Sequence, residues 1–340
     1  MSRDMDRYAR QTILPGIGEA GQARLAGAHL LVVGAGGLGV PVLQYLTGAG
    51  IGRITLLDPD IVEAGNLHRQ PIYGPHLGRP KAEAAADVAR SLNPAVAVVP
   101  QVGWLTPANA PALVAQADLA LDCADSFAAS YILSDACLAA GRPLVSASAL
   151  GFSGYVGGFC GTAPSLRAVF PDLPETLATC DTAGALGPVV GMLGLIQAQM
   201  ALAILLSLTP SPLGQLVRYD MQGFRSTSFR FDGAPEPDET FAFIAKNCLQ
   251  DNDFLVDLRD TTEAPIAAAP FARRHRVEDF GPAGPVPAAG QRAVFACRSG
   301  LRAWRAAERL RPHWPGPIAL LADPASSSTD PDPLDQRTTR

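Results

Sequence analysis

Residues 29–150 alternate between short apolar runs and segments with the periodicity of helices. Continuous apolar runs are typical of strands that are buried on both faces of a parallel sheet. The expected strands are residues 29–34, 53–58, 96–99, 119–122 and 143–146, and the expected helices are residues 40–50, 81–92 and 135–140. This alternation predicts an α/β fold of the Rossmann-like, doubly wound type with a mainly parallel sheet.

Beyond residue 150 the pattern becomes looser. Glycine content rises over residues 151–159, and residues 217–220 and 226–231 predict a late antiparallel extension of the sheet. The apolar stretch 189–206 contains two glutamines and follows a proline, so it is predicted to be a buried helix rather than a membrane span.

A second, smaller α/β unit is expected after an acidic, proline-bearing stretch. Its strands are predicted at residues 254–257 and 293–296, and its helix at residues 301–310. The expected organisation is a first domain over 5–232, a linker over 233–245, a small domain over 246–323 and a disordered tail over 324–340.

Composition narrows the class of protein. The chain has 27 Lys and Arg against 32 Asp and Glu, a net charge of −5, which argues against a protein whose main task is to hold nucleic acid. The N-terminus has no apolar run of the kind found in secretory signals. The six cysteines include no Cys-x-x-Cys pair, so they are interpreted as reduced thiols of a cytoplasmic protein.

The first chemical signal is a glycine-rich turn between the first predicted strand and its helix. The sequence reads G-x-G-x-x-G, with glycines at Gly34, Gly36, Gly37 and Gly39. Such a turn brings backbone N–H groups close to a phosphate, and Asp58, at the end of the next strand, can accept both ribose hydroxyls. A tight turn without a ligand is the alternative interpretation.

The polar residues after Asp58 favour ATP over NAD, the usual ligand of this turn. Asn66, Arg69 and Gln70 follow the second strand, Lys81 opens the next helix, and Arg10 lies upstream. Several cations suit a triphosphate with about four negative charges better than a dinucleotide with about two.

A carboxylate pair follows the fourth predicted strand. Asp122 and Asp125 lie where the carboxyl ends of parallel strands face the ligand crevice, so Asp125 is a candidate ligand of Mg²⁺. The alternative role for Asp125 is to cap the helix that starts near Ser126.

Taken together, these motifs resemble the ubiquitin-activating-enzyme-like adenylyltransferases, the ThiF/MoeB/HesA family, over about residues 5–232. The resemblance implies that Asp58 holds the ribose of ATP, that Asp125 holds Mg²⁺, and that Arg10 reaches the triphosphate bound to the neighbouring subunit of a homodimer. It implies the same phosphate-binding role for Asn66, Arg69, Gln70 and Lys81. The implied reaction is adenylation of the C-terminal glycine carboxylate of a small ubiquitin-like sulfur-carrier protein that ends in Gly-Gly.

The chain departs from the family in one respect. Many members bind zinc through two Cys-x-x-Cys pairs, but Ser165 and Ala168 stand where the first pair would be, and no pair follows Phe231. A closed structural site of that kind needs four thiolates, so no zinc is predicted.

Two cysteines are candidate reactive thiols. Cys180 matches the position of a cysteine that forms a covalent link to the carrier in some family members, and a passive role is the alternative. Cys297 begins the run Cys-Arg-Ser-Gly-Leu-Arg, and residues 246–323 resemble a short rhodanese domain in which Cys297 would take sulfur from a persulfide donor. An inactive docking module is the alternative for this unit.

Several functions remain open at this point. The carrier could serve molybdopterin or thiamine synthesis, since that choice lies in a protein–protein surface. A tRNA-modifying dehydratase that adenylates a carboxylate on tRNA (threonylcarbamoyladenosine) would use the same fold. A nicotinamide-dependent oxidoreductase and a non-catalytic carrier-binding scaffold are alternatives of other classes.

Overall fold

The computed structural model describes residues 3–172 and 184–323. These described residues form two compact units: those up to 105 and from 109 to 238 belong to the first, and residues 106–108 together with those from 239 onward belong to the second. Each unit has its own sheet, of eight strands in the first and five in the second.

The eight-stranded sheet has the order β3-β2-β1-β4-β5-β6-β7-β8. The parallel strands are β1 (His29–Val33), β2 (Arg53–Asp58), β3 (Ala97–Val102), β4 (Leu119–Asp122) and β5 (Pro143–Leu150). The antiparallel extension consists of β6 (Ser153–Cys160), β7 (Gln215–Asp220) and β8 (Arg225–Arg230). The predicted doubly wound sheet with a late antiparallel extension is therefore confirmed.

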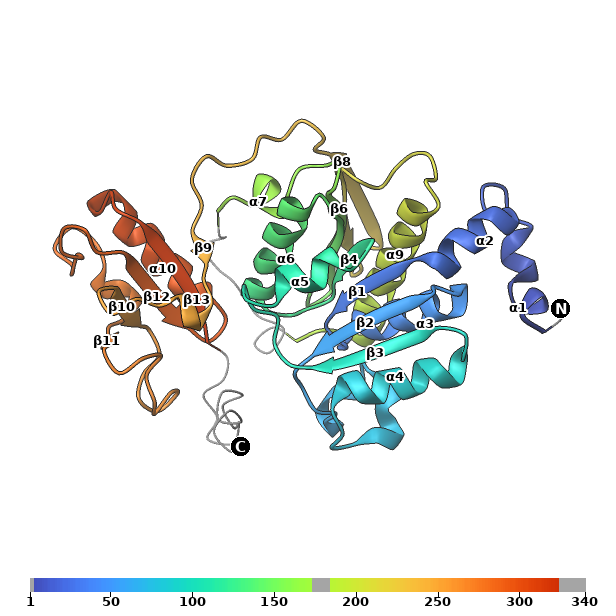
Figure 1. Cartoon of the computed structure of the whole chain (residues 1–340), viewed down its shortest axis with the longest axis horizontal. Coiled ribbons are helices and arrows are strands. Elements are labelled where there is room, and N and C mark those ends of the chain that lie inside the picture. Colours follow the sequence, from blue (N-terminus) through green and yellow to red (C-terminus); the bar gives the residue numbers. More distant parts are fainter. Residues whose placement is uncertain (1–2, 173–183, 324–340) are drawn as a thin grey trace, which may run out of the picture. The chain divides into compact units, whose positions relative to one another are not determined.

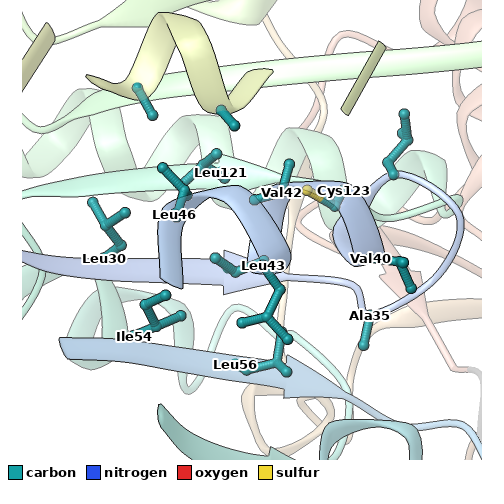
Figure 2. Close-up of a cluster of buried hydrophobic side chains, with 14 of the residues drawn as sticks. Leu30, Ala35, Val40, Val42, Leu43, Leu46, Ile54, Leu56, Leu121 and Cys123 are labelled. Carbon is teal, nitrogen blue, oxygen red and sulfur yellow. The ribbon is translucent and has the colours of Figure 1, made fainter. Parts of the chain in front are cut away.

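Helices cover both faces of this sheet (Figure 1). Helices α3 (Gly39–Ala49), α4 (Lys81–Leu92) and α9 (Gly187–Leu205) pack together on one face, and α5 (Ala110–Ala115) and α6 (Phe127–Ala140) pack on the other. Figure 2 shows Val42, Leu43 and Leu46 of α3 among buried side chains of β1, β2 and β4. The other helical elements among the described residues of this unit are α1 (Arg3–Thr12), α2 (Gly18–Gly27), α7 (Leu166–Val169), η1 (Ala64–Asn66) and η2 (Pro71–His76).

The glycine-rich stretch 151–159 is not loose, because most of it forms β6. A Cβ atom on Gly154 would overlap Leu193 of α9, and one on Gly158 would lie 2.5 Å from the Pro212 carbonyl oxygen. The glycines therefore reflect close packing against this strand. Helix α6 also begins eight residues earlier than predicted, at Phe127 rather than at residue 135.

Helix α9 packs against α3 and against strands β4, β5 and β6, so the prediction of a buried helix there is confirmed. By length and composition alone, it is the one helix within the described residues that could cross a membrane.

The second sheet is entirely parallel, with the order β11-β10-β12-β13-β9. Its elements are β9 (Ala242–Phe243), β10 (Phe254–Asp257), β11 (Arg273–Arg274), β12 (Ala293–Cys297), β13 (Ile318–Ala322), α10 (Leu301–Leu310), η3 (Lys246–Cys248), η4 (Val277–Asp279) and η5 (Arg311–His313). Strand β9 lies within residues 233–245, where the sequence predicted a linker. Local sequence could not show this two-residue strand, because it is defined by its pairing with β13.

Candidate functional site

The glycine-rich turn joins β1 to α3 and has two kinds of glycine. Gly34 has φ +99°, and a Cβ atom there would lie 2.5 Å from the Cys123 carbonyl oxygen, so the turn itself requires glycine. At Gly36 the nearest atom to an added Cβ is Gln70 Nε2 at 3.5 Å, so the backbone is open there. Gly37 lies against Val190, and Gly39 against the Gly34 carbonyl. Helix α3 has no acidic side chain in its first turn, which leaves its N-terminus suited to an anion.

Asp58 fixes this turn from the end of β2. Its buried carboxylate accepts hydrogen bonds from Ala35 N at 2.7 Å and from Asp60 N at 2.9 Å. Burial raises the pKa of Asp58 to about 6, against the lowering effect of these two hydrogen bonds. The Tyr73 hydroxyl donates to the Ala35 carbonyl at 2.7 Å and so also holds this turn.

Lys81 and Gln70 are buried beside the turn. Lys81 Nζ lies 2.8 Å from the carboxylate of Asp60, which is half exposed. Gln70 is 2% exposed, and its Oε1 atom has no hydrogen-bond partner. Because an unsatisfied buried polar atom costs about 1–3 kcal/mol, Gln70 is suited to a ligand that supplies the missing bond.

Asn66 and Arg69 lie in the loop after β2. Arg69 Nη2 donates to Asn66 Oδ1 at 2.6 Å, so the two side chains form one unit that keeps the guanidinium in place. Both are partly exposed and can reach a ligand.

The end of β4 lies directly beside the glycine turn. Cys123 N donates to the Val33 carbonyl at 2.8 Å. Asp122 is fully buried and accepts hydrogen bonds from Ser146 Oγ at 2.8 Å and Ala124 N at 3.2 Å. Gln197 of α9 donates to the Asp122 carbonyl at 2.7 Å, which ties this loop to the core.

Asp125 follows these anchored residues and is exposed. Ser126 takes the N-cap position of α6 and makes no side-chain capping hydrogen bond there. No group of three or more His, Cys, Asp or Glu side chains suited to a metal ion occurs in the part of the chain that the structure describes. Mg²⁺ at nucleotide sites is commonly bound by one or two carboxylates together with phosphates, so a single carboxylate such as Asp125 is chemically sufficient.

Burial raises the pKa of Asp122 from 3.8 to about 6. A carboxyl group whose pKa is raised in the folded protein adds most to the free energy of unfolding below pH 4. This contribution falls as the pH rises through about 6. We therefore expect Asp122→Asn, which can keep both hydrogen bonds, to be at least as stable as the parent at pH 7.5. Relative to the parent, its stability should improve by up to about 3 kcal/mol between pH 4 and 7.5. Urea unfolding of both proteins at several pH values measures this, and parallel pH curves would contradict it.

Arg10 lies away from the glycine turn of its own chain. Tyr8 accepts a hydrogen bond from Asn93 Nδ2 at 2.7 Å and packs on Gly50, and Gln11 donates to the Ala49 carbonyl at 3.1 Å. Helix α1 is therefore held at the C-terminal end of α3, while the glycine turn is at its N-terminal end. The two ends of an 11-residue helix are about 16 Å apart. In Figure 1, α1 lies beyond the amino ends of the strands.

Of the two candidate thiols, Cys180 lies outside the described residues. Cys297 ends β12 and is fully buried, and Ala303 N donates to its Sγ atom at 3.4 Å. Burial raises the pKa of Cys297 above its ordinary value, although the loop N–H groups and Arg302 oppose this shift. The Arg302 guanidinium is held by both carboxylate oxygens of Glu263, whereas Arg298 is exposed.

The profile of the ThiF family matches residues 8–241. The chain belongs to the ThiF family.

Curated relatives of this ThiF-family chain are named as enzymes. It is 48% identical over 221 residues to the adenylyltransferase and sulfurtransferase MOCS3 of Bos taurus, a match that covers 64% of this chain and 49% of that protein. It is 40% identical over 219 residues to the SAMP-activating enzyme E1 of Haloferax volcanii, a match that covers 64% of this chain and 81% of that protein. The chain thus spans about half the length of the MOCS3 relatives that it matches.

Solved structures share the ThiF-family fold at low identity. The match to the structure of E. coli MccB has a TM-score of 0.58 and 19% identity, and covers 68% of this chain and 71% of the MccB chain. The match to the structure of PaaA has a TM-score of 0.57 and 21% identity, and covers 68% of this chain and 75% of the PaaA chain.

Proposed function

We propose that this chain is an ATP-dependent adenylyltransferase that activates the C-terminal glycine carboxylate of a small ubiquitin-like sulfur carrier. The observation that carries the proposal is the buried Asp58 carboxylate, which is fixed against an open glycine turn with Lys81 and Gln70 beside it. Relatives named adenylyltransferase and sulfurtransferase, a relative named SAMP-activating enzyme E1, and a crystal structure of E. coli MccB with ATP support it.

Each site residue has a role in this reaction. Asp58 accepts the ribose hydroxyls of ATP, and the N-terminus of α3 faces the phosphates. Asn66, Arg69, Gln70 and Lys81 bind the triphosphate, and Lys81 exchanges its bond to Asp60 for a phosphate oxygen. Asp125 would hold Mg²⁺, which neutralises phosphate charge when bound.

The chemistry requires alignment more than acid–base catalysis. A terminal carboxylate has a pKa near 3.5 and is already ionised at neutral pH. Its oxygen attacks the α-phosphorus, the bond from that phosphorus to the β-phosphate oxygen breaks, and pyrophosphate leaves with the electron pair. Arg69 and Lys81 stabilise the charge that develops on the leaving group. We place Arg10 of a second copy at the same triphosphate, so that the active enzyme is a homodimer.

The proposal is tested by ATP–pyrophosphate exchange with the purified full chain. The molybdopterin-type carrier, the thiamine-type carrier and tRNA are offered in turn, with NAD as a competitor of ATP. Exchange that depends on one carrier and is insensitive to NAD supports the proposal and identifies the pathway. Exchange with tRNA alone, or none with any acceptor, would overturn it.

We further propose that the second unit is a rhodanese-like module that supplies sulfur through Cys297. Its parallel sheet places Cys297 at the carboxyl end of β12, and Arg302 and three backbone N–H groups lie near the sulfur. Cys180 is the proposed site of a covalent link to the carrier. The cysteines in the described part of the chain are all free, which suits a persulfide donor and the reducing cytoplasm.

We expect Cys297→Ala to reduce sulfur transfer from thiosulfate to background while adenylation stays unchanged. In the parent, the Cys297 thiolate attacks the outer sulfur of thiosulfate, the S–S bond breaks and sulfite leaves. Because burial raises the pKa of this thiol, the parent rate should increase from pH 7 to pH 9. The exposed Cys248 provides the control variant Cys248→Ala. Parallel loss of both activities in Cys297→Ala would contradict the division of work between the units.

A further inference from the structure

Two segments 71 residues apart meet at the start of α7. The Glu236 carboxylate accepts one hydrogen bond from Ser165 N at 2.7 Å and another from Ser165 Oγ at 2.5 Å. Ser165 is itself fully buried, and its Oγ atom accepts hydrogen bonds from Arg167 N and Ala168 N, the backbone N–H groups of the second and third residues of α7. Glu236 therefore links the chain beyond β8 to the N-cap of α7.

The same short helix is also attached to α6. The Arg167 guanidinium forms two hydrogen bonds with the Asp135 carboxylate, at 2.6 and 2.8 Å, and lies 5.0 Å from the centre of the Tyr131 ring. The Tyr131 hydroxyl donates to the Phe170 carbonyl at 2.8 Å, and Ser134 Oγ accepts from Leu166 N at 3.1 Å. Since the Arg167 side chain is 5% exposed, its ion pair is shielded from solvent on that side.

These two segments are the ones in which zinc-binding members of the family carry their cysteine pairs. Ser165 and Ala168 replace the first pair, and Ala168 offers no ligand atom. The Ser165 hydroxyl is already engaged by Glu236 and by the backbone of α7. A closed zinc site takes four Cys, His or carboxylate ligands, and the residues in these segments do not supply them. The structure therefore disagrees with the metal that the family resemblance implies.

Two side-chain pairs, Ser165 with Glu236 and Arg167 with Asp135, are joined by the hydrogen bond from Arg167 N to Ser165 Oγ. We propose that they form a metal-free polar clip that takes the place of the structural zinc. The clip joins the chain after β8, helix α7 and helix α6 through hydrogen bonds and one ion pair. Charge-assisted hydrogen bonds and a largely buried fork of an arginine with a carboxylate are the contacts with enough strength for this role. The inference does not depend on the proposed reaction.

The test compares thermal unfolding of the full chain with that of clip variants. E236Q keeps the size of the side chain but removes its charge, and S165A removes both the hydroxyl and the helix cap. We expect each to lower the melting temperature of the first unit by about 5 °C. The double variant should lose less than the sum of the two, because both changes break the same link. The matched control is D232N, whose exposed pair with Arg230 should contribute less than about 1 °C.

Metal content gives a second readout that does not require any variant to fold. The parent protein is expected to contain far less than one zinc per chain by elemental analysis, and its melting temperature should not change with a strong zinc chelator. Stoichiometric zinc whose removal lowers the melting temperature would overturn the proposal. Equal melting temperatures for E236Q and D232N would overturn it as well.

Discussion

We expect Asp125→Ala to lower carrier-dependent ATP–pyrophosphate exchange by at least about 100-fold. Asp125 is the exposed carboxylate at the end of the loop that Asp122 and Gln197 anchor beside the glycine turn. Its removal takes away the protein's proposed hold on Mg²⁺, so that phosphate charge is no longer neutralised in the correct position. Exchange measured over a range of Mg²⁺ concentrations tests this result.

Two comparisons separate this effect from damage to the fold. Asp125 is exposed, so the melting temperature of Asp125→Ala should stay close to that of the parent. Asp87→Ala removes another partly exposed carboxylate, which lies on α4 and pairs with Arg79, and should leave exchange unchanged. Full exchange by Asp125→Ala at low Mg²⁺ would show that this carboxylate does not hold the metal.

The second large effect tests the proposed assembly of the site from two chains. Arg10→Ala and Lys81→Met should each lower exchange by at least about 100-fold when tested alone. After the two are mixed and their subunits exchange, half of the dimers contain one chain of each kind. One of the two sites in such a dimer has both residues intact, so about a quarter of all sites should recover.

This recovery follows from the position of α1. Tyr8 and Gln11 hold α1 at the end of α3 that is remote from the glycine turn, so Arg10 of the same chain is not brought to that turn. Exchange is measured before and after mixing, with native mass spectrometry to show that mixed dimers form. The exposed Arg24 of α2 provides the control variant Arg24→Ala. Mixed dimers without recovered activity would refute a shared site.

The edge of the first unit that carries the glycine turn could be predicted because each of its parts has a local signal. Strands β1 and β2 are continuous apolar runs, the turn after β1 is marked by glycines, and Asp58 ends the second run. Strand β6 has no such signal, because its close packing against α9 requires glycine rather than a strand-forming side chain at positions such as Gly154.

The supporting residues could not be predicted, because their partners are distant in sequence. Tyr73 holds Ala35 across 38 positions, and Gln197 holds Asp122 across 75. Asp60, the partner of Lys81, lies closer to it in sequence but could not be predicted for the same reason. The motif around Cys297 located a candidate thiol, but motif spacing carries no information on burial, and the thiol is fully buried.

The polar clip also has a consequence for the conditions under which the protein can work. A site built from four thiolates is lost when metal is scarce, and its cysteines are targets of peroxide. A serine, a glutamate and an arginine–aspartate pair have neither weakness. We therefore expect newly made chains to fold fully in zinc-starved cells and to keep their first unit intact during oxidative stress.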